Sequence, residues 1–363
     1  MNGLSHLPVV DCHIHLRATV DAIVNCTELM EANKYKAVNI VCIPQLDNES
    51  LVLNPVAMLF KALQPKKVYV FPGLRYPAGG ITERGRADFA DQVRLYRRMG
   101  ADGIKMHEGK PTVRKKTGVP LNAPVYDELY ATLEAEKIPV LYHVGDPWIF
   151  WNEMTAPAYA RKYGWVYTDG SFPDNETIFA ETESVLATHP KLRVIFAHFY
   201  FMSCDRARAA DFLDRHPSVG FDLTPGVEMY PDFSQDREKW REFFVKYQDR
   251  IYFGTDDVGG EGAPNIGRIA DGMDRTYVVR NFLETDHEFM TWEARSRGIA
   301  LEKPVLEKIY SRNFESLAGS APRKLDIGLA IEDCEKAISL ATGGPAQVHS
   351  ELHRIAMQLR SLA

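Results

Sequence analysis

Most of this chain alternates short apolar runs with longer amphipathic segments, and this pattern restricts the possible fold more than any other feature. The apolar runs typical of strands are Pro8–His13, Ala37–Ile43, Val68–Leu74, Gly103–His107, Ile138–His143, Leu192–His198, Val219–Leu223 and Ile251–Asp256. The amphipathic segments between them include Arg84–Met99, Val125–Glu136, Asn175–His189, Asp205–His216 and Arg237–Tyr247. Strands separated by helices pair in parallel through right-handed crossovers. Eight such runs predict an α/β fold, a (β/α)8 TIM-like barrel.

The segments around and beyond these runs complete the expected architecture. No Gly-x-Gly-x-x-Gly motif follows the first run, so an open dinucleotide-binding sheet would lack its phosphate loop. The C-terminal part contains a glycine-rich segment and three helical patterns, at Val258–Gly262, Tyr277–Glu284, Val305–Leu317 and Asp326–Leu362. We therefore expect a distorted barrel domain over residues 1–320 and a C-terminal helical appendage over residues 321–363 that packs on it.

Composition narrows the class of protein. The chain has 363 residues, of which 45% are hydrophobic and 25% charged, with a formal net charge of −6. This balance is ordinary for a soluble enzyme and gives no reason to expect nucleic acid or an anionic membrane as a partner. No segment reaches the ~20 apolar residues of a membrane span, and the N-terminus lacks the features of a secretory signal. Cysteines without CxxC spacing favour reduced thiols and a cytoplasmic location.

The first apolar run ends in two histidines separated by one residue. Side chains alternate faces along a strand, so His13 and His15 point the same way while Cys12 and Ile14 point the other way. Two imidazoles on one face can reach the same divalent metal. The motif is weak evidence by itself, because short motifs need structural context to support them.

The ends of three further runs supply that context. His143 ends the fifth run, His198 the sixth and Asp256 the eighth. The carboxyl ends of the strands form the active-site face of such a barrel. The chain has 11 histidines, and core packing does not readily explain why four of them lie at these strand ends together with an aspartate. Imidazole and carboxylate ligands suit one divalent ion, with Zn²⁺ favoured and Mn²⁺, Fe²⁺ and Co²⁺ as alternatives.

At this point the chain resembles a known group, the amidohydrolase superfamily, and within it the amidohydrolase-2 branch. The matching motifs are Asp11-x-His13-x-His15, Gly103-Ile104-Lys105-Met106-His107, His143-x-Gly145-Asp146, Ala197-His198, Phe253-Gly254-Thr255-Asp256 and Asn313-Phe314-Glu315-Ser316-Leu317. The resemblance spans roughly residues 8–320 and implies a metal-dependent (β/α)8 barrel. Members of this branch include hydrolases of C–N and C–O bonds as well as non-oxidative decarboxylases of aromatic or unsaturated acids.

The resemblance also implies roles for individual residues. His13, His15, His143 and Asp256 would hold the metal, and His198 would orient or deprotonate the attacking water. Asp256 could also accept the proton of that water and pass it to the leaving group. We therefore expect a metal-dependent hydrolase of a small polar substrate, with a metal-dependent decarboxylase as the alternative. A non-catalytic barrel that acts as a binding module would be expected to have lost these residues.

Several charged residues near the expected barrel mouth have more than one interpretation. In other branches of the superfamily a lysine at the position of Lys105 is carboxylated and bridges two metals. Here we favour a substrate anchor or a salt-bridged scaffold residue. Arg75 is a second candidate for a substrate carboxylate, because arginine binds carboxylates through two nitrogens. Asp222 is expected to face the mouth, whereas His107 and Asp257 are not expected to be ligands.

An aromatic segment follows the fifth apolar run. Trp148, Phe150 and Trp151 lie within four residues of one another. They could form a wall of the substrate site, contribute to an oligomer contact, or pack within their own loop, and the sequence leaves these three possibilities open. Because symmetric dimers are the commonest soluble assemblies, we expect a homodimer or a higher homo-oligomer.

Overall fold

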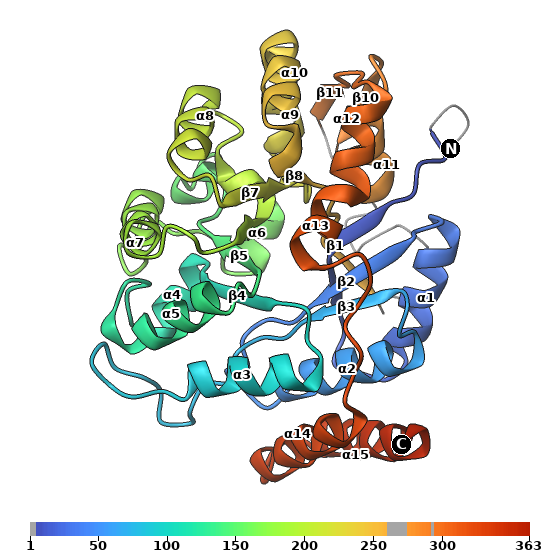
Figure 1. Ribbon diagram of the computed structural model, residues 1–363. Coiled ribbons are helices and arrows are strands. Elements are labelled where there is room, and N and C mark those ends of the chain that lie inside the picture. Colours follow the sequence, from blue (N-terminus) through green and yellow to red (C-terminus); the bar gives the residue numbers. More distant parts are fainter. Residues whose placement is uncertain (1–4, 260–273, 292–293) are drawn as a thin grey trace.

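A computed structural model describes residues 5–259, 274–291 and 294–363 of the chain. Figure 1 shows the strands at the centre of the molecule with helices around them. The strands of the central sheets are β1 (Val10–Leu16), β2 (Ala37–Val41), β3 (Val68–Phe71), β4 (Ile104–Gly109), β5 (Val140–Val144), β6 (Val194–Phe196), β7 (Val219–Asp222), β8 (Ile251–Tyr252) and β9 (Asp257–Gly259). All their pairings are parallel, as the alternation of apolar runs and helical segments predicts.

Within the described residues, these strands form two sheets, with the orders β3-β2-β1-β9 and β4-β5-β6-β7-β8. Backbone contacts join the sheets at both seams. Gly73, just after β3, forms a parallel bridge with Lys105 near the start of β4. At the other seam, the Cys12 amide donates a hydrogen bond of 2.9 Å to the carbonyl oxygen of Phe253. The fold is therefore the expected distorted (β/α)8 barrel, in which the strand ladder is interrupted at these two seams.

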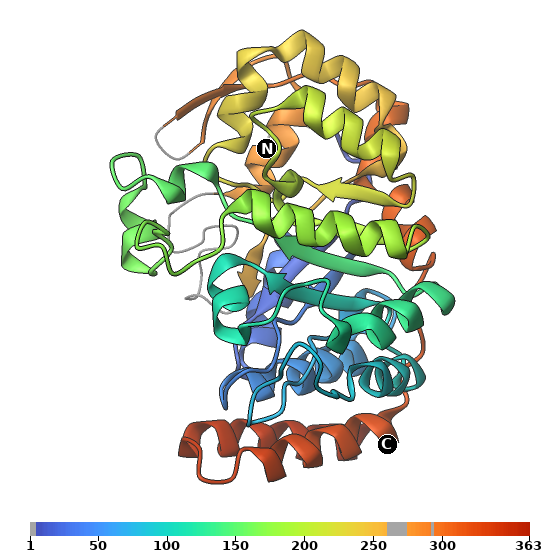
Figure 2. The same cartoon turned by 90° about the vertical axis from the view of Figure 1, so that its left-hand side faces the viewer.

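The helices form an outer layer around the strands (Figures 1 and 2). They are α1 (Ala22–Ala32), α2 (Leu53–Leu63), α3 (Phe89–Met99), α4 (Pro111–Thr117), α5 (Asp127–Ala135), α6 (Ala158–Lys162), α7 (Asn175–Thr188), α8 (Arg206–Arg215), α9 (Met229–Gln235), α10 (Arg237–Lys246), α11 (Arg275–Glu284), α12 (Lys303–Glu307), α13 (Asn313–Ala318), α14 (Ile327–Leu340) and α15 (Ala346–Leu362). Aspartate caps several of them: the side chain of Asp174 accepts the Thr177 amide at α7, and Asp205 does the same for Arg208 at α8.

The interior of the barrel is filled by apolar side chains, most of them from alternate strand positions and one from α13. The buried cluster there consists of Val10, Cys12, Ala37, Val41, Tyr69, Phe71, Leu141, Ile195, Ala197, Tyr252 and Phe314. Cys12 belongs to this cluster, whereas Ile14, which strict alternation would place on the same face, packs in the larger core, because the register of β1 shifts between Asp11 and Ile14. Gly103, just before β4, is constrained by the same packing, because a Cβ atom there would lie 2.5 Å from the Phe71 ring.

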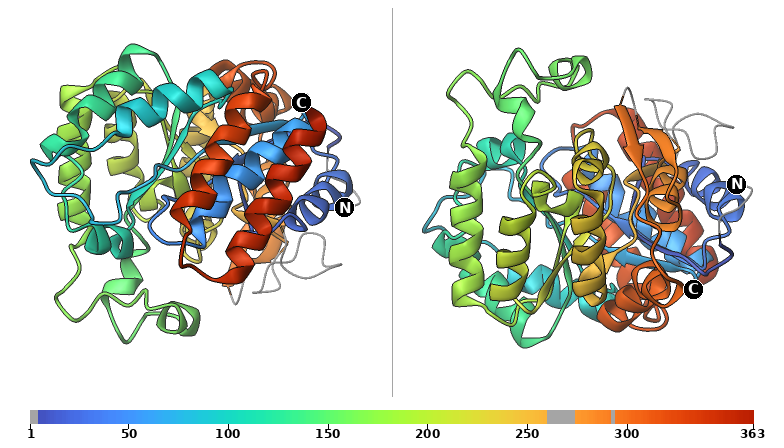
Figure 3. Two further views of the ribbon diagram at one scale, coloured as in Figure 1. Left: turned by 90° about the horizontal axis from the view of Figure 1, so that it is seen from below. Right: turned by 90° about the horizontal axis from the view of Figure 1, so that it is seen from above.

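The C-terminal residues form two helices, α14 and α15, that pack against each other and against α2. Seen from below in Figure 3, the pair lies across the blue N-terminal helices. Arg75 contributes to this attachment, since its guanidinium pairs with Asp333 of α14 at 3.4 Å and donates to Gln45 at 2.7 Å. The division of the chain into two domains near residue 320 stays a prediction.

The aromatic segment after β5 begins an excursion of the chain over residues 147–174. Figures 2 and 3 show it, in green, projecting from the barrel. Phe150, Ala160 and Tyr167 form a small core of their own, against which Trp151 and Trp165 pack. The loop thus packs on itself, which was one of the three possibilities left open by the sequence.

Several local features differ from the sequence-based expectation. The predicted run Leu192–His198 is a strand only to Phe196, and the run Ile251–Asp256 only to Tyr252, after which the chain bends before β9. An antiparallel hairpin of β10 (Glu288–Thr291) and β11 (Ala294–Arg297) was not predicted. Of the glycine-rich segment Val258–Gly262, residues 260–262 lie outside the described part. Among the described residues, the search for a helix that could cross a membrane found none.

Candidate metal centre

Two histidines of β1 and an aspartate beyond β8 converge at one end of the barrel. The Nε2 atoms of His13 and His15 lie 3.3 Å apart. Oδ1 of Asp256 is 3.6 Å from the first of these nitrogens and 3.3 Å from the second. Three donor atoms of the kind that zinc prefers therefore lie within 4.8 Å of one another. Among the described residues, no other group of histidine, cysteine or acidic side chains comes together so closely.

Asp256 reaches this position because the chain leaves regular strand geometry. Its φ angle is +58°, in the left-handed region that residues other than glycine rarely adopt. The Asp256 amide donates to the His13 carbonyl oxygen at 2.8 Å. Thr255, which precedes Asp256, is held by buried Asp11, because the Asp11 carboxylate accepts a hydrogen bond from the Thr255 hydroxyl at 2.7 Å. These contacts, distant in sequence, offset the cost of the unusual backbone.

Charges around Asp256 keep its side chain ionised. Nη1 of Arg275 lies 3.3 Å from Oδ2, the oxygen that does not face the histidines. Burial alone would raise the pKa of Asp256, but its hydrogen bond with His15 and its electrostatic interactions with His13, His15 and Arg275 hold that pKa well below its usual value. The carboxylate is therefore available as a metal ligand at neutral pH.

Asp222, at the end of β7, orients His13 from behind. Its Oδ2 lies 2.8 Å from Nδ1 of His13, while its Oδ1 accepts the His198 amide at 2.8 Å and the Thr224 amide at 3.1 Å. A proton on Nδ1 satisfies the carboxylate and leaves the lone pair of Nε2 facing His15 and Asp256. Burial, with a further contribution from the Lys105 charge, lowers the pKa of His13 to about 3, so the ring is neutral as a ligand must be.

Lys105, on β4, enters the same space. Its Nζ lies 3.3 Å from Nε2 of His13, and the residue is only 1% exposed. Within the described part of the chain, the Lys105 ammonium forms no direct ion pair, although the carboxylates of Asp222 and Asp256 attract it electrostatically. Burial lowers the pKa of Lys105 to about 8. A buried cation without a directly paired carboxylate is suited to holding an anionic group of a substrate.

Two further histidines lie beside this group. The ring of His198 is 5.8 Å from that of His13 and 4.9 Å from that of His143, measured between centroids. The Nδ1 atom of His198 lies 3.3 Å from the Thr224 carbonyl oxygen, an acceptor, so this nitrogen carries the proton and Nε2 carries the lone pair. Burial lowers the pKa of His198, which favours the neutral form of this potential base.

His143 lies close to the centre but outside its closest group of donors. Its Nε2 faces the Gly145 carbonyl oxygen at 3.1 Å and Oδ1 of Asp146 at 3.2 Å. Two acceptors on this side place the proton on Nε2 and leave the lone pair on Nδ1. His107, whose ring centroid is 4.7 Å from that of His143, has a buried Nδ1 with no hydrogen-bond partner.

Asp146 connects His143 to the excursion over residues 147–174. In addition to its contact with His143, the Asp146 carboxylate accepts hydrogen bonds from Nζ of Lys110 at 2.7 Å and 2.8 Å and from the hydroxyl of Tyr167. Asn175 holds the backbone of Asp146 on both sides, with contacts of 3.1 Å and 2.7 Å. The sequence motif contained Asp146 but gave it no role, and Lys110, Tyr167 and Arg275 carried no recognisable signal.

The side chains of three further sequence candidates, Arg75, Trp148 and Trp151, contact residues other than His13, His15 and Asp256. The Arg75 guanidinium binds Asp333 of α14 and Gln45, so its contacts are structural. The indole nitrogen of Trp148 donates to the Phe201 carbonyl oxygen at 3.1 Å, and Trp151 packs on Tyr167 with a ring distance of 4.7 Å. Asp257 lies in β9, where burial raises its pKa to about 6.

Comparison with known families extends this description. The family model described as amidohydrolase matches residues 71–313, which is more than half of the chain. The chain belongs to the amidohydrolase family. Family membership indicates an enzyme, and amidohydrolases typically bind a divalent metal. The matched segment contains His143, His198 and Asp256 of this amidohydrolase, whereas His13 and His15 precede it. No curated protein sequence matches the chain.

Solved structures resemble this amidohydrolase in fold. An uncharacterised TIM-barrel protein from Bordetella bronchiseptica is 15% identical, with a TM-score of 0.54 over 86% of this chain and 98% of that chain. An amidohydrolase II is 14% identical, with a TM-score of 0.54 over 85% and 99%. A 4-oxalomesaconate hydratase from Rhodopseudomonas palustris is 13% identical, with a TM-score of 0.53 over 92% and 98%. At these identities the likeness concerns the fold alone.

Proposed function

We propose that this amidohydrolase is a metal-dependent hydrolase that cleaves a C–O or C–N bond of a small polar substrate. The observation that carries the proposal is the convergence of His13, His15 and Asp256 within 4.8 Å. The donor set fits one divalent ion, with zinc favoured, because it combines two imidazoles with a carboxylate. Nδ1 of His143, whose lone pair is free, is the fourth protein ligand in this proposal.

When bound, such an ion lowers the pKa of a coordinated water toward ~7 and polarises a substrate oxygen. The surrounding side chains have complementary tasks. Nε2 of His198 accepts a hydrogen bond from the attacking water and aligns it. Asp256 accepts the proton of that water and returns it to the departing oxygen or nitrogen. Lys105 holds an anionic group of the substrate, and Arg275 keeps the Asp256 carboxylate in place.

The arrangement around Lys105 favours one second candidate function, a non-oxidative decarboxylase of an aromatic or unsaturated acid. The buried ammonium 3.3 Å from His13 Nε2 would hold a substrate carboxylate beside the metal ligands. Hydrolysis and decarboxylation differ in whether the centre activates water or binds the oxygens of the substrate. A shared fold does not decide between them, since proteins with one barrel architecture catalyse different reactions.

A substrate screen tests the proposal. Purified protein supplied with zinc is incubated with panels of lactones, amides and aromatic carboxylic acids, and both hydrolysis products and released CO₂ are measured. We expect hydrolysis that is lost after chelation, restored by metal and abolished by His13→Ala. His189→Ala is a matched control, because His189 instead contacts Glu134 between α5 and α7. Release of CO₂ without hydrolysis would establish the decarboxylase, and full activity of His13→Ala would refute both functions.

A further inference from the structure

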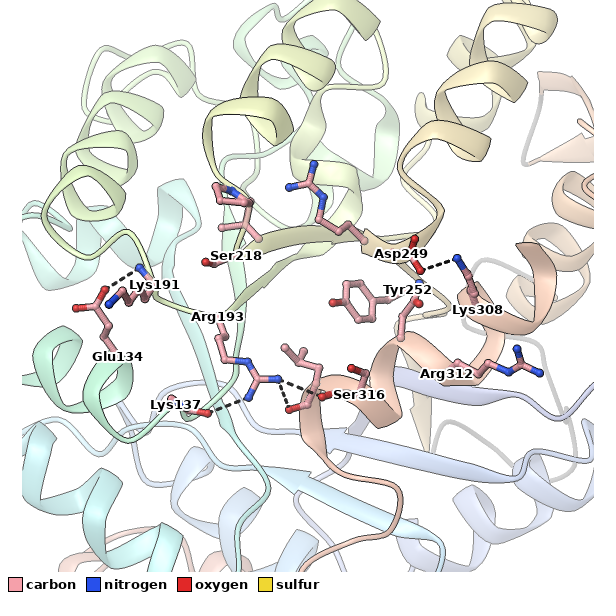
Figure 4. A pocket seen from close by; sticks show the side chains of 15 residues that line it. Glu134, Lys137, Lys191, Arg193, Ser218, Asp249, Tyr252, Lys308, Arg312 and Ser316 are labelled. Carbon is pink, nitrogen blue, oxygen red and sulfur yellow. Dashed lines mark hydrogen bonds and ion pairs between the residues drawn. The ribbon is translucent and has the colours of Figure 1, made fainter. Parts of the chain in front are cut away.

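A cavity of about 650 Å³ opens at the opposite end of the barrel from the metal centre. It lies at the N-terminal ends of the strands, since its wall includes Val219 at the start of β7 and Arg193 just before β6 (Figure 4). Its lining residues are Glu134, Lys137, Lys191, Arg193, Pro217, Ser218, Val219, Asp249, Arg250, Tyr252, Lys308, Arg312, Asn313, Ser316 and Leu317. Catalytic sites of such barrels lie at the other end, so the proposed function does not account for this cavity.

The charge of the cavity is opposite to that of the whole protein. Six of its lining residues are basic and two are acidic, whereas the chain has a formal net charge of −6. The acidic groups already have partners: Asp249 pairs with Lys308 at 2.8 Å, and Glu134 accepts the Lys191 amide at 2.7 Å. The exposed ammonium groups of Lys137 and Lys191 form no ion pair with any described residue. The cavity thus has an excess of positive charge.

Hydrogen bonds hold the side chains of two arginines in the wall of this cavity. Arg193 donates to the Lys137 carbonyl oxygen at 3.2 Å and, across the cavity, to the Leu317 carbonyl oxygen at 2.8 Å. Arg250 donates to the carbonyl oxygens of Leu213 and His216 at 2.7 Å and 3.0 Å. Each guanidinium contacts neutral carbonyls, so its positive charge is not neutralised by a carboxylate. Pre-ordered cations of this kind lose little conformational freedom when an anion binds.

Tyr252 supplies a hydrogen-bond donor inside the cavity. Figure 4 shows its ring pointing into the open space between Ser218 and Arg193. Its hydroxyl makes no hydrogen bond to any described residue, and the whole residue is only 7% exposed. Burial raises the pKa of Tyr252, which keeps the hydroxyl protonated and able to donate.

We propose that this cavity is a second binding site, specific for a small organic or inorganic oxyanion that carries two negative charges. Its size lies in the range of small-ligand pockets, roughly 300–1,000 Å³. In this site Lys137 and Lys191 attract the anion at the rim, and Tyr252 donates a hydrogen bond to one of its oxygens at the floor. Carboxylate and phosphate oxygens share this chemistry, so a dicarboxylate and a phosphate group are the two ligand sources to distinguish.

Isothermal titration of the metal-loaded protein tests the site, with succinate and inorganic phosphate as separate probes and acetate as the monoanion control. We expect at least one dianion to bind more tightly than acetate. The double variant Lys137→Gln/Lys191→Gln should weaken that binding about tenfold or more, the scale of a charged hydrogen bond. The exposed pair Lys66→Gln/Lys336→Gln removes the same charge elsewhere and should leave the affinity unchanged.

Tyr252→Phe gives a second, independent measurement. It deletes one hydroxyl and keeps the ring, so about two- to tenfold weaker binding is expected for the loss of a neutral hydrogen bond. His13→Ala, which alters the metal centre at the other end, should retain this binding. Equal affinity in wild type and the lysine double variant, an equal loss in the control pair, or loss only in His13→Ala would each overturn the second site. A preference for phosphate or for succinate identifies the source of the ligand.

Discussion

Oδ2 of Asp222 lies 2.8 Å from Nδ1 of His13, on the edge of the imidazole opposite the Nε2 atom that faces His15 and Asp256. The aspartate comes from β7 and the histidine from β1, so the barrel fold itself brings the two together. A carboxylate behind a ligand histidine fixes the tautomer and the direction of the ring. The centre therefore depends on a residue that does not itself face the metal-binding atoms.

Replacing Asp222 with asparagine tests this dependence. An amide in place of the carboxylate removes the charge that fixes the proton on Nδ1 of His13, and loss of such a supporting group typically lowers metal affinity about 10- to 100-fold. We expect this decrease in Asp222→Asn, measured by competition with a fluorescent zinc chelator. Asp232→Asn is the control, because the Asp232 side chain contacts Ser203. Wild-type zinc affinity in Asp222→Asn would contradict the orienting role.

His198 is expected to serve the reaction more than the metal. Its Nδ1 is committed to the Thr224 carbonyl oxygen at 3.3 Å, which leaves Nε2 to accept a proton or a hydrogen bond. His198→Ala should retain most of the metal while turnover falls about 10²–10⁴-fold, the usual contribution of an acid–base group. Metal content and turnover are measured on the same preparation. A loss of metal as large as that of His13→Ala would make His198 a ligand.

Sequence reasoning could identify the side chains of the centre, but it could not predict their backbone conformations. His13 and His15 could be paired because strand residues alternate faces. His198 and Asp256 were placed at the ends of regular strands, yet their φ angles are +55° and +58°. Such angles are unfavourable for L-residues and have no local sequence signature here. Contacts distant in the sequence maintain them, such as Asp222 with the His198 amide.

Arg75 illustrates the same limit for interactions between side chains. An arginine after the third apolar run suggested a substrate anchor, but its ion-pair partner is Asp333, 258 positions away in the sequence. Neither residue carries a local pattern that identifies the other. The aromatic segment was ambiguous for a similar reason, because Tyr167, on which Trp151 packs, comes 16 residues later in the sequence. Periodicity predicted the barrel, whereas such pairings arise only once the barrel has formed.

The buried histidines should make the metal-free protein sensitive to acid. Burial lowers the pKa of His13 to about 3 from a reference of 6.5, and burial also lowers the pKa values of His107, His143 and His198. Below pH 6.5 the unfolded chain binds protons that the native rings exclude. The free energy of unfolding therefore falls as pH decreases from 6.5 toward 3, by about 1.4 kcal/mol per pH unit for a single such group.

Urea unfolding of the chelator-treated protein at pH 7.5 and pH 5.5 measures this effect. We expect a lower free energy of unfolding at pH 5.5, with a smaller difference between the two pH values in His107→Gln. The exposed residue His287 is the matched control, and His287→Gln should show the wild-type difference. Equal stability of the wild type at the two pH values would contradict the account of neutral, buried imidazoles.

The homo-oligomer expected from the sequence remains a prediction, with the excursion over residues 147–174 as its candidate interface. Met154 in this segment is 91% exposed, whereas Trp151 is half-buried. Sedimentation should give a dimer for the wild type and a weaker dimer for Trp151→Ser. A monomeric wild type would exclude the dimer. A Trp151→Ser dimer that is intact but inactive would instead place the loop at the substrate site.

The metal content of the purified protein tests the central claim most directly. Protein prepared without chelator and analysed by inductively coupled plasma mass spectrometry should contain about one equivalent of a divalent metal, zinc favoured, as for a catalytic site with an open position. His13→Ala, His15→Ala and Asp256→Ala should each lose it, while the distant variant His189→Ala should retain it. Two equivalents together with a carboxylated Lys105 would contradict the single-metal centre, and no metal after zinc supplementation would contradict the centre altogether.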